Sequence, residues 1–316
     1  MKKVLKWLAL AIVCVAAALV LVYYLFPGAV INLSIRSARS AADVAAKESP
    51  GDGFTWPYLD GGNGDTVVLF HGFGMSRDMW GTLMPALTKK FRVVAPDMPG
   101  FGSNSRVKDA SYDVKGQALL LDRFLARLGL QRFHLVGFSM GGGVAARYAS
   151  EFPGKVAKLV LIDAFGVKAA MKNIAEKALD RGERILLYRN AGEYDAVMRL
   201  AYAQPPAIPA HFKRYIAALG AQDYDLHGMI FDHLGREGLD TNWKILGKIT
   251  APTLVLWGAD DRIFDRTCAD RYSAGIRNSR KTVIPGSGHM VYMEKPEESV
   301  GAVMALAAPP RPHPAA

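Results

Sequence analysis

The sequence predicts an α/β fold: a mostly parallel, doubly wound sheet with a helical cap inserted after a central strand, preceded by a transmembrane helix. Three features lead to this expectation. After Pro50, short apolar runs alternate with longer amphipathic segments; between Phe165 and about Trp243 there is no strand candidate; and the chain opens on a long apolar run. A chain of 316 residues is long enough for one large domain with such additions.

The opening apolar run extends from Trp7 to Phe26 and contains 20 residues without a charge. A helix of that length rises about 30 Å, which matches the hydrocarbon core of a bilayer. Three lysines precede the run, so the positive-inside tendency places the N-terminus in the cytoplasm. We therefore predict a single-pass membrane anchor over residues 1–27, with the rest of the chain on the opposite side of the membrane, which is the periplasm in a bacterium.

Other interpretations of this run stay open. A cleaved signal peptide would have a shorter apolar core with a small-residue cleavage site directly after it, whereas this run ends in Tyr-Tyr-Leu-Phe-Pro. A buried core helix is the other alternative, although a leading, charge-free segment of this length is seldom one. Arg36 and Arg39 follow the run and weaken the predicted orientation without reversing it.

The rest of the chain divides into a connector, a main domain and a tail. Residues 28–53 are predicted to be a juxtamembrane connector that is partly helical through Ala41–Lys47, residues 54–308 the main domain, and residues 309–316 a Pro-rich, disordered tail. The predicted strands are Val67–Phe70, Arg92–Ala95, His134–Val136, Leu159–Ile162, Thr253–Trp257 and Lys281–Ile284. The predicted helices are Met79–Leu87, Tyr112–Leu128, Met140–Glu151, Thr267–Ala274 and Pro296–Leu306. Such alternation forms a parallel sheet whose sites lie at the carboxyl ends of the strands.

The segment of about 166–243 departs from this alternation. It holds only helical patterns, interrupted by Pro205, Pro206 and Pro209. An all-helical insertion after a central strand is typical of a cap over the active-site end of a sheet. The alternative, helices that simply pack on the sheet, would require further strands among them.

The strongest local signal is HLVGFSMGGG (134–143), where a predicted strand gives way to a helix rich in small residues. Gly137, Ser139 and Gly141 form the G-x-S-x-G pattern of a nucleophile turn. The glycines allow close backbone approach, and the turn places the Ser139 hydroxyl at a helix N-terminus, which stabilises developing negative charge. We predict Ser139 as the nucleophile and the Met140 backbone N–H as an oxyanion donor.

A second oxyanion donor is expected from the loop His71-Gly72-Phe73-Gly74, which follows the first buried strand. Phe73 is the predicted donor, and its ring is expected to line an acyl pocket. His71 precedes Ser139, against the order serine, acid, histidine that accompanies such a turn. We therefore predict a structural role for His71 within the loop.

A serine nucleophile needs a general base, and that base needs an orienting carboxylate. Asp261 lies 122 residues after Ser139, beyond the strand TLVLW, and His289 lies 28 residues further in the loop PGSGHM. Both follow predicted strands, so both can converge on Ser139. Asp261 is the predicted acid and His289 the predicted base, while Asp260 and Asp163 stay open as alternative acids.

Five stretches carry a resemblance to a known family: HGFGMSRDMW (71–80), VVAPDMPGFG (93–102), HLVGFSMGG (134–142), PTLVLWGADD (252–261) and GHMVYMEKP (288–296). From about Phe54 to Leu306 the chain resembles the α/β-hydrolase superfamily, and within it the membrane-anchored monoacylglycerol lipases and related bacterial triacylglycerol lipases. The cap resembles them less clearly. The resemblance implies the same functional residues: Ser139, Asp261 and His289, with Phe73 and Met140 as oxyanion donors.

We therefore expect a serine carboxylic-ester hydrolase that acts on acylglycerols or similar lipid esters through an acyl-enzyme. Apolar residues beside the predicted catalytic loops are the candidates for substrate binding: Phe73, Met75, Phe138, Phe165 and Met290. Two alternatives stay open. One is a carbon–carbon bond hydrolase of the ring-cleavage type, which uses the same three catalytic residues, and the other is a non-catalytic lipid-binding protein on the same scaffold.

The charge of the chain points to a membrane surface as a partner. Lys and Arg number 39 against 29 Asp and Glu, a net charge of +10. Residues 1–50 hold six basic and two acidic residues, and residues 167–220 of the predicted cap hold nine basic and five acidic ones. Anchor and cap are therefore expected to face anionic lipid. No nucleic-acid-binding motif is present, and no obligate protein partner is implied.

No metal or other cofactor is expected. The group His227, Asp232 and His233 lacks the spacing of a known zinc motif. Cys14 and Cys268 are too few for a disulfide framework.

Overall fold

The centre of the computed structural model, which describes residues 1–170, 172, 174–236 and 238–307, is an eight-stranded sheet. Its strands are β1 (Val44–Glu48), β2 (Pro57–Gly61), β3 (Thr66–Phe70), β4 (Arg92–Pro96), β5 (Phe133–Phe138), β6 (Val156–Ile162), β7 (Thr253–Gly258) and β8 (Ser279–Ile284). They lie in the order β1-β2-β4-β3-β5-β6-β7-β8. Only the pairs β1–β2 and β2–β4 are antiparallel. The predicted mostly parallel α/β sheet is confirmed; the predicted tail lies outside the described residues.

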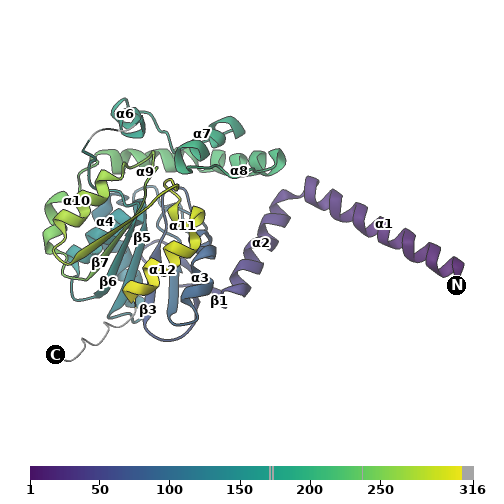
Figure 1. Cartoon of the computed structure of the whole chain (residues 1–316), viewed down its shortest axis with the longest axis horizontal. Helices are drawn as coiled ribbons and strands as arrows, with labels where there is room; N and C mark the ends of the chain where they lie inside the picture. The colour runs from purple at the N-terminus through teal and green to yellow at the C-terminus, as the bar shows by residue number, and fades with distance from the viewer. Residues whose placement is uncertain (171, 173, 237, 308–316) are drawn as a thin grey trace.

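Helices cover both faces of this sheet. They are η1 (Arg77–Thr82), α3 (Met84–Leu87), α4 (Val114–Arg127), α5 (Met140–Glu151), η2 (Trp243–Lys248), α10 (Thr267–Gly275), α11 (Val291–Glu294) and α12 (Pro296–Ala307). Helices α4 and α5 pack on each other, and Figure 1 shows α12 in front of the sheet with α4 behind it. Because both faces are covered, the central strand β5 is buried at all six positions, and its sequence FHLVGF is apolar apart from His134.

The cap consists of α6 (Ile174–Asp180), α7 (Ala191–Ala201), α8 (Ala210–Gln222) and α9 (Tyr224–Arg236), all between β6 and β7. Figure 1 shows these helices stacked on one end of the sheet. Among the described residues of this interval there is no strand, as the sequence predicts. The cap therefore closes the end of the sheet at which the loops after β5, β7 and β8 emerge.

The predicted connector contains more structure than expected. A helix, α2 (Pro27–Ala41), is followed directly by β1, so the expectation of partial helix through Ala41–Lys47 is wrong. Strand β1 is an edge strand whose side chains are mostly exposed, and it is held by backbone pairing to β2 from Val44↔Gly61 to Glu48↔Pro57. Its sequence, VAAKE, therefore lacks the apolar run that reveals the central strands.

The predicted helix Met79–Leu87 is divided into η1 and α3. Pro85 lies in the first turn of α3, where its missing N–H costs nothing, but the same residue cannot continue a helix from the N-terminal side. The division places Asp78 and Arg77 in a separate short turn beside the loop that follows β3.

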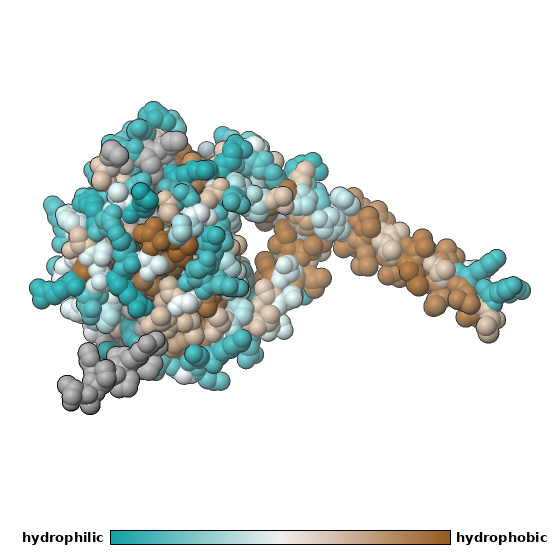
Figure 2. Space-filling model, in the orientation of Figure 1, coloured by the Kyte–Doolittle hydropathy of each residue, from teal (hydrophilic) through white to brown (hydrophobic). Residues whose placement is uncertain are grey.

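The N-terminal helix α1 (Lys2–Leu25) projects away from the domain, and its surface is apolar except near its N-terminal end (Figures 1 and 2). Its mean hydropathy is 2.7, and within the described chain it is the one helix long and apolar enough to cross a membrane. No residue of α1 is buried, so the alternative of a buried core helix is wrong.

The end of α1 and the following helix α2 both contact the main domain. The ring of Tyr23 packs on His211 and Phe212 of the cap helix α8, with centroid distances of 4.9 and 5.3 Å. The Arg39 guanidinium donates two hydrogen bonds of 2.7 Å to the Asp78 carboxylate in η1. The N-terminal helices are thus attached both to the cap, through α1, and to the turn that follows the β3 loop, through α2.

Candidate active site

Ser139 occupies a strained turn between β5 and α5. Its backbone has φ +53° and ψ −120°, a conformation that costs a non-glycine residue roughly 1–3 kcal/mol. Backbone hydrogen bonds hold it there, because Ser139 N–H donates to Ile162 O at 2.9 Å and Phe165 N–H donates to Ser139 O at 2.9 Å. This backbone conformation places the Ser139 hydroxyl beyond the end of β5, at the start of α5.

Two glycines make this turn sterically feasible. A Cβ on Gly141 would lie 2.3 Å from Phe70 O and 2.4 Å from His71 O, and both of these atoms belong to backbone. A Cβ on Gly137 would lie 2.3 Å from Gly141 O. The G-x-S-x-G pattern is therefore required by two close approaches, one between Gly141 and the end of β3 and one between Gly137 and Gly141 within the turn.

The structure brings Ser139, His289 and Asp261 into one hydrogen-bonded chain. Ser139 Oγ lies 2.8 Å from His289 Nε2, and His289 Nδ1 lies 2.8 Å from Asp261 Oδ2. In the tautomer that fits these contacts, Nδ1–H donates to the carboxylate and Nε2 accepts from the hydroxyl. All three side chains are buried. This arrangement can remove a proton from Ser139 and stabilise the imidazolium that results.

Each partner of Ser139 is fixed by its own loop. Asp261 Oδ1 accepts the backbone N–H groups of Ile263 at 2.7 Å and Phe264 at 3.0 Å. The loop of His289 is held by the end of the cap helix α7, since Met290 N–H donates to Ala201 O at 3.0 Å. A Cβ on Gly258 would lie only 2.0 Å from Gly288 O, so this glycine lets the two loops approach each other.

Of the three candidate acids, only Asp261 is hydrogen-bonded to His289. Asp260 is exposed, and its backbone N–H donates to Ser287 O. Asp163 is fully buried at the end of β6, where its Oδ1 accepts Gly258 N–H at 2.8 Å. Burial, and next the neighbouring Asp261 charge, raise the pKa of Asp163 well above its ordinary value.

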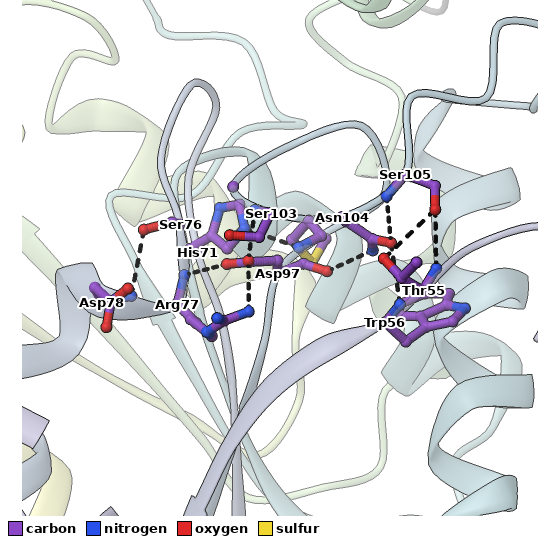
Figure 3. Close-up of polar contacts among 12 residues, drawn as sticks. Thr55, Trp56, His71, Ser76, Arg77, Asp78, Asp97, Ser103, Asn104 and Ser105 are labelled. Carbon is purple, nitrogen blue, oxygen red and sulfur yellow. Dashed lines mark hydrogen bonds and ion pairs between the residues drawn. The ribbon is translucent and has the colours of Figure 1, made fainter. Parts of the chain in front are cut away.

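A polar network anchors the loop that carries Phe73 (Figure 3). His71 is buried, its Nε2 accepts Met98 N–H at 2.8 Å, and its Nδ1 lies 2.8 Å from Gly72 O. Burial lowers the pKa of His71, which favours the neutral ring that these two contacts require. Because backbone groups occupy both ring nitrogens, His71 is not available as a general base.

Asp97 links the turn at Arg77 to the loop at Ser103. Its carboxylate accepts the backbone N–H of Arg77 at 2.7 Å, Arg77 Nη1 at 2.8 Å and Ser103 N–H at 2.8 Å (Figure 3). The loop also lies directly against Ser139, since a Cβ on Gly72 would be 3.2 Å from Ser139 Cβ. The backbone of Phe73 is therefore held beside Ser139 by buried groups.

An apolar cavity of about 580 Å³ extends from Ser139 into the cap. Phe73 and Phe165, both predicted to bind substrate, line it together with Met140. The other apolar lining residues could not be selected from the sequence, because their approach depends on how the cap folds: Ala169, Ala170, Leu179, Ile185, Leu186, Phe231, Leu234, Leu239, Ile263 and Phe264.

The remaining predicted substrate-binding residues lie elsewhere. Met75 lines a second cavity of about 280 Å³, which shares Phe73 and Leu186 with the first. Phe138 and Met290 are buried and line neither cavity. The centroids of the Phe138 and His289 rings lie 5.0 Å apart, so Phe138 supports the imidazole by packing against it.

Several known proteins are similar to this chain. A family model described as alpha/beta hydrolase fold matches residues 65–296. Monoacylglycerol lipase abhd6-A from Xenopus laevis is 30% identical over 298 residues, which cover 89% of this chain and 88% of that protein. Lipase 1 from Psychrobacter immobilis is 27% identical and covers 84% of each chain. The crystal structure of a membrane phospholipase A, described as a bacterial virulence factor, is 34% identical with a TM-score of 0.86, and covers 97% of this chain and 98% of its own.

Proposed function

Because this chain belongs to the α/β-hydrolase family, we propose that it is a membrane-anchored serine hydrolase that cleaves carboxylic esters of acylglycerols or similar lipids. One observation carries the proposal: the hydrogen-bonded chain from Ser139 through His289 to Asp261 opens onto an apolar cavity. The names of the similar proteins, a monoacylglycerol lipase and a bacterial lipase, support the same class of substrate.

In the proposed reaction His289 Nε2 accepts the hydroxyl proton as Ser139 Oγ attacks the ester carbonyl carbon. The tetrahedral intermediate then expels the alcohol, which takes the proton from His289, and the acyl group remains on Ser139. Water hydrolyses this acyl-enzyme with His289 again as base, which releases the fatty acid. The Asp261 carboxylate keeps Nδ1–H oriented and balances the positive charge of the imidazolium.

The negative charge on the tetrahedral oxygen requires donors that are in place beforehand. We assign this role to the backbone N–H groups of Met140, at the first turn of α5, and Phe73, in the anchored loop. Support for the assignment comes from the contact between Gly72 and Ser139 and from the presence of Phe73, Met140 and Ser139 around one cavity.

The cavity is the proposed site for the acyl chain, and a substitution that fills it tests this. Ala169 lines the cavity, whereas Ala221 lies exposed on α8 and lines neither cavity. We expect Ala169→Phe to lower kcat/KM for a long-chain monoacylglycerol about tenfold or more, because the ring occupies space that the chain needs. Hydrolysis of p-nitrophenyl acetate, which has no long chain, is expected to change about threefold at most.

The matched control is Ala221→Phe, which is expected to leave the ratio of the two kcat/KM values at its wild-type level. Rates measured over a series of acyl lengths locate the chain length at which Ala169→Phe begins to act. An equal loss of kcat/KM on the acetyl and the long-chain ester, or no loss on either, would show that the acyl chain does not bind in this cavity.

We assign α1 as a single membrane span, with the N-terminus in the cytoplasm and the catalytic domain on the opposite side. Support comes from the length and hydropathy of α1 and from the lysines that precede it. A reporter enzyme that is active only outside the cytoplasm, fused to the C-terminus, is expected to be active; an inactive but folded fusion contradicts this orientation.

A further inference from the structure

A second buried carboxyl lies beside the pair formed by His289 and Asp261. Asp163 follows β6, and a carboxylate oxygen of Asp163, one of Asp261 and a ring nitrogen of His289 all lie within 4.8 Å of one another. The two carboxyls come from the ends of different strands, β6 and β7. They therefore reach the same histidine from separate parts of the sheet.

The backbone of Asp163 is strained and its side chain is incompletely hydrogen-bonded. Its φ is +43°, a conformation that is costly for a residue with a Cβ. Oδ1 accepts Gly258 N–H and the backbone N–H of Val291 faces the carboxyl, but Oδ2 has no hydrogen bond within the described part of the chain. A buried, unsatisfied oxygen on a strained residue is costly, and such features cluster at functional sites.

Ionising both of these neighbouring carboxyl groups costs free energy, because the two buried negative charges repel each other. Burial and, next, the negative charge of Asp261 raise the pKa of Asp163 well above its ordinary value, which favours the protonated form of Asp163. Asp163 is thus a neutral acid that the reaction described above does not use.

We propose that Asp163 is a positioning residue that holds a reserve carboxyl for His289 and can orient the imidazole in place of Asp261. The inference rests on the proposed function. If Asp261 is replaced by asparagine, the charge that opposes ionisation of Asp163 is removed, and Asp163 can release its proton to solvent. Its carboxylate is then the single anion beside the imidazolium that forms when His289 accepts the Ser139 proton.

A double-mutant cycle on the full chain in detergent micelles, with p-nitrophenyl butyrate as substrate, tests this proposal. Loss of the orienting acid alone lowers kcat about 10⁴-fold in a serine protease. We expect Asp261→Asn to cost less than that here. We also expect Asp163→Asn to lower kcat by a factor at least about tenfold larger in the Asp261→Asn background than in the wild-type background.

Equal factors in the two backgrounds, or a double variant as active as Asp261→Asn alone, would overturn the proposal. Asparagine can still accept Gly258 N–H, so the hydrogen bond that holds the loop is kept in Asp163→Asn. A purely structural role of Asp163 predicts the same factor in both backgrounds together with a lowered melting temperature.

A spectroscopic measurement keeps the proposal testable if Asp163→Asn does not fold. The Nδ1 proton of a histidine bound to a carboxylate resonates far downfield in proton NMR. We expect this signal in the wild type and in Asp261→Asn; its absence from folded Asp261→Asn contradicts the proposal. Ser139→Ala separates the two hypotheses: turnover in that variant refutes the proposed function, whereas an inactive Ser139→Ala with no coupling in the cycle refutes only the role of Asp163.

Discussion

Replacing Ser139 with alanine is expected to lower kcat for ester hydrolysis about a million-fold, the scale measured when the nucleophile of a serine protease is removed. The reason is that, among the described residues, the Ser139 hydroxyl is hydrogen-bonded to His289, with Oγ 2.8 Å from Nε2, and alanine leaves no oxygen there to form the acyl-enzyme. The measurement is steady-state hydrolysis of a monoacylglycerol and of a p-nitrophenyl ester by the full chain.

The control is Ser150→Ala on the same helix, where the hydroxyl donates to Arg147 O and serves only the helix. It is expected to keep kcat within about twofold of wild type, as is usual for a change away from the reacting groups. A Ser139→Ala protein that retains a few per cent of wild-type turnover would contradict the mechanism.

Substitutions of Ser139 are also expected to differ in their effect on the stability of the fold. Alanine keeps the Cβ that makes φ +53° costly, whereas glycine removes it. Ser139→Gly is therefore expected to be about 1 kcal/mol more stable than Ser139→Ala, while both are inactive.

Replacing Gly141 with alanine is expected to destabilise the fold by about 3 kcal/mol or more, the second large effect. The added Cβ would lie 2.3–2.4 Å from the carbonyl oxygens of Phe70 and His71, and neither backbone can move without disrupting β3 or the turn. Thermal and denaturant unfolding of the full chain in detergent, followed by circular dichroism, measures the loss. Activity should fall with it, because the turn that presents Ser139 is displaced.

Gly301 provides the matched control. It lies in α12, and a Cβ there would have no heavy atom within 4 Å. Gly301→Ala is expected to stabilise the protein by about 0.5–1 kcal/mol, because alanine is the better helix former. A Gly141→Ala protein that unfolds at the wild-type temperature would show that the turn tolerates a side chain.

The meeting of Ser139, Asp261 and His289 at one site could be predicted from the sequence because the signals that place each residue are local. Ser139 is set by glycines that act within five residues, and Asp261 and His289 each follow a buried strand, so a rule about strand ends places them together. The sequence favoured Asp261 as the acid but left Asp163 open as an alternative, since both follow strands of the same sheet. Both are buried, and the hydrogen bond between Asp261 and His289 Nδ1 separates them in the structure.

Features that depend on contacts distant in sequence could not be predicted in this way. Strand β1 is defined by its backbone pairing with β2, and its sequence has too few apolar residues to predict a strand. Phe138 and Met290 adjoin Ser139 and His289 in the chain, yet both are buried and line neither cavity. Adjacency to a catalytic residue does not make a residue part of the pocket, because alternate residues of a strand or turn face different sides.

The most direct test of the central claim, that Ser139 is an activated nucleophile in a lipid-ester hydrolase, is covalent labelling. The full chain is treated with a long-chain fluorophosphonate and digested, and the modified peptide is identified by mass spectrometry. We expect one adduct, on Ser139, which monoacylglycerol slows and which is absent from Ser139→Ala. Folded protein that gains no adduct, or gains it on another residue, would contradict the account.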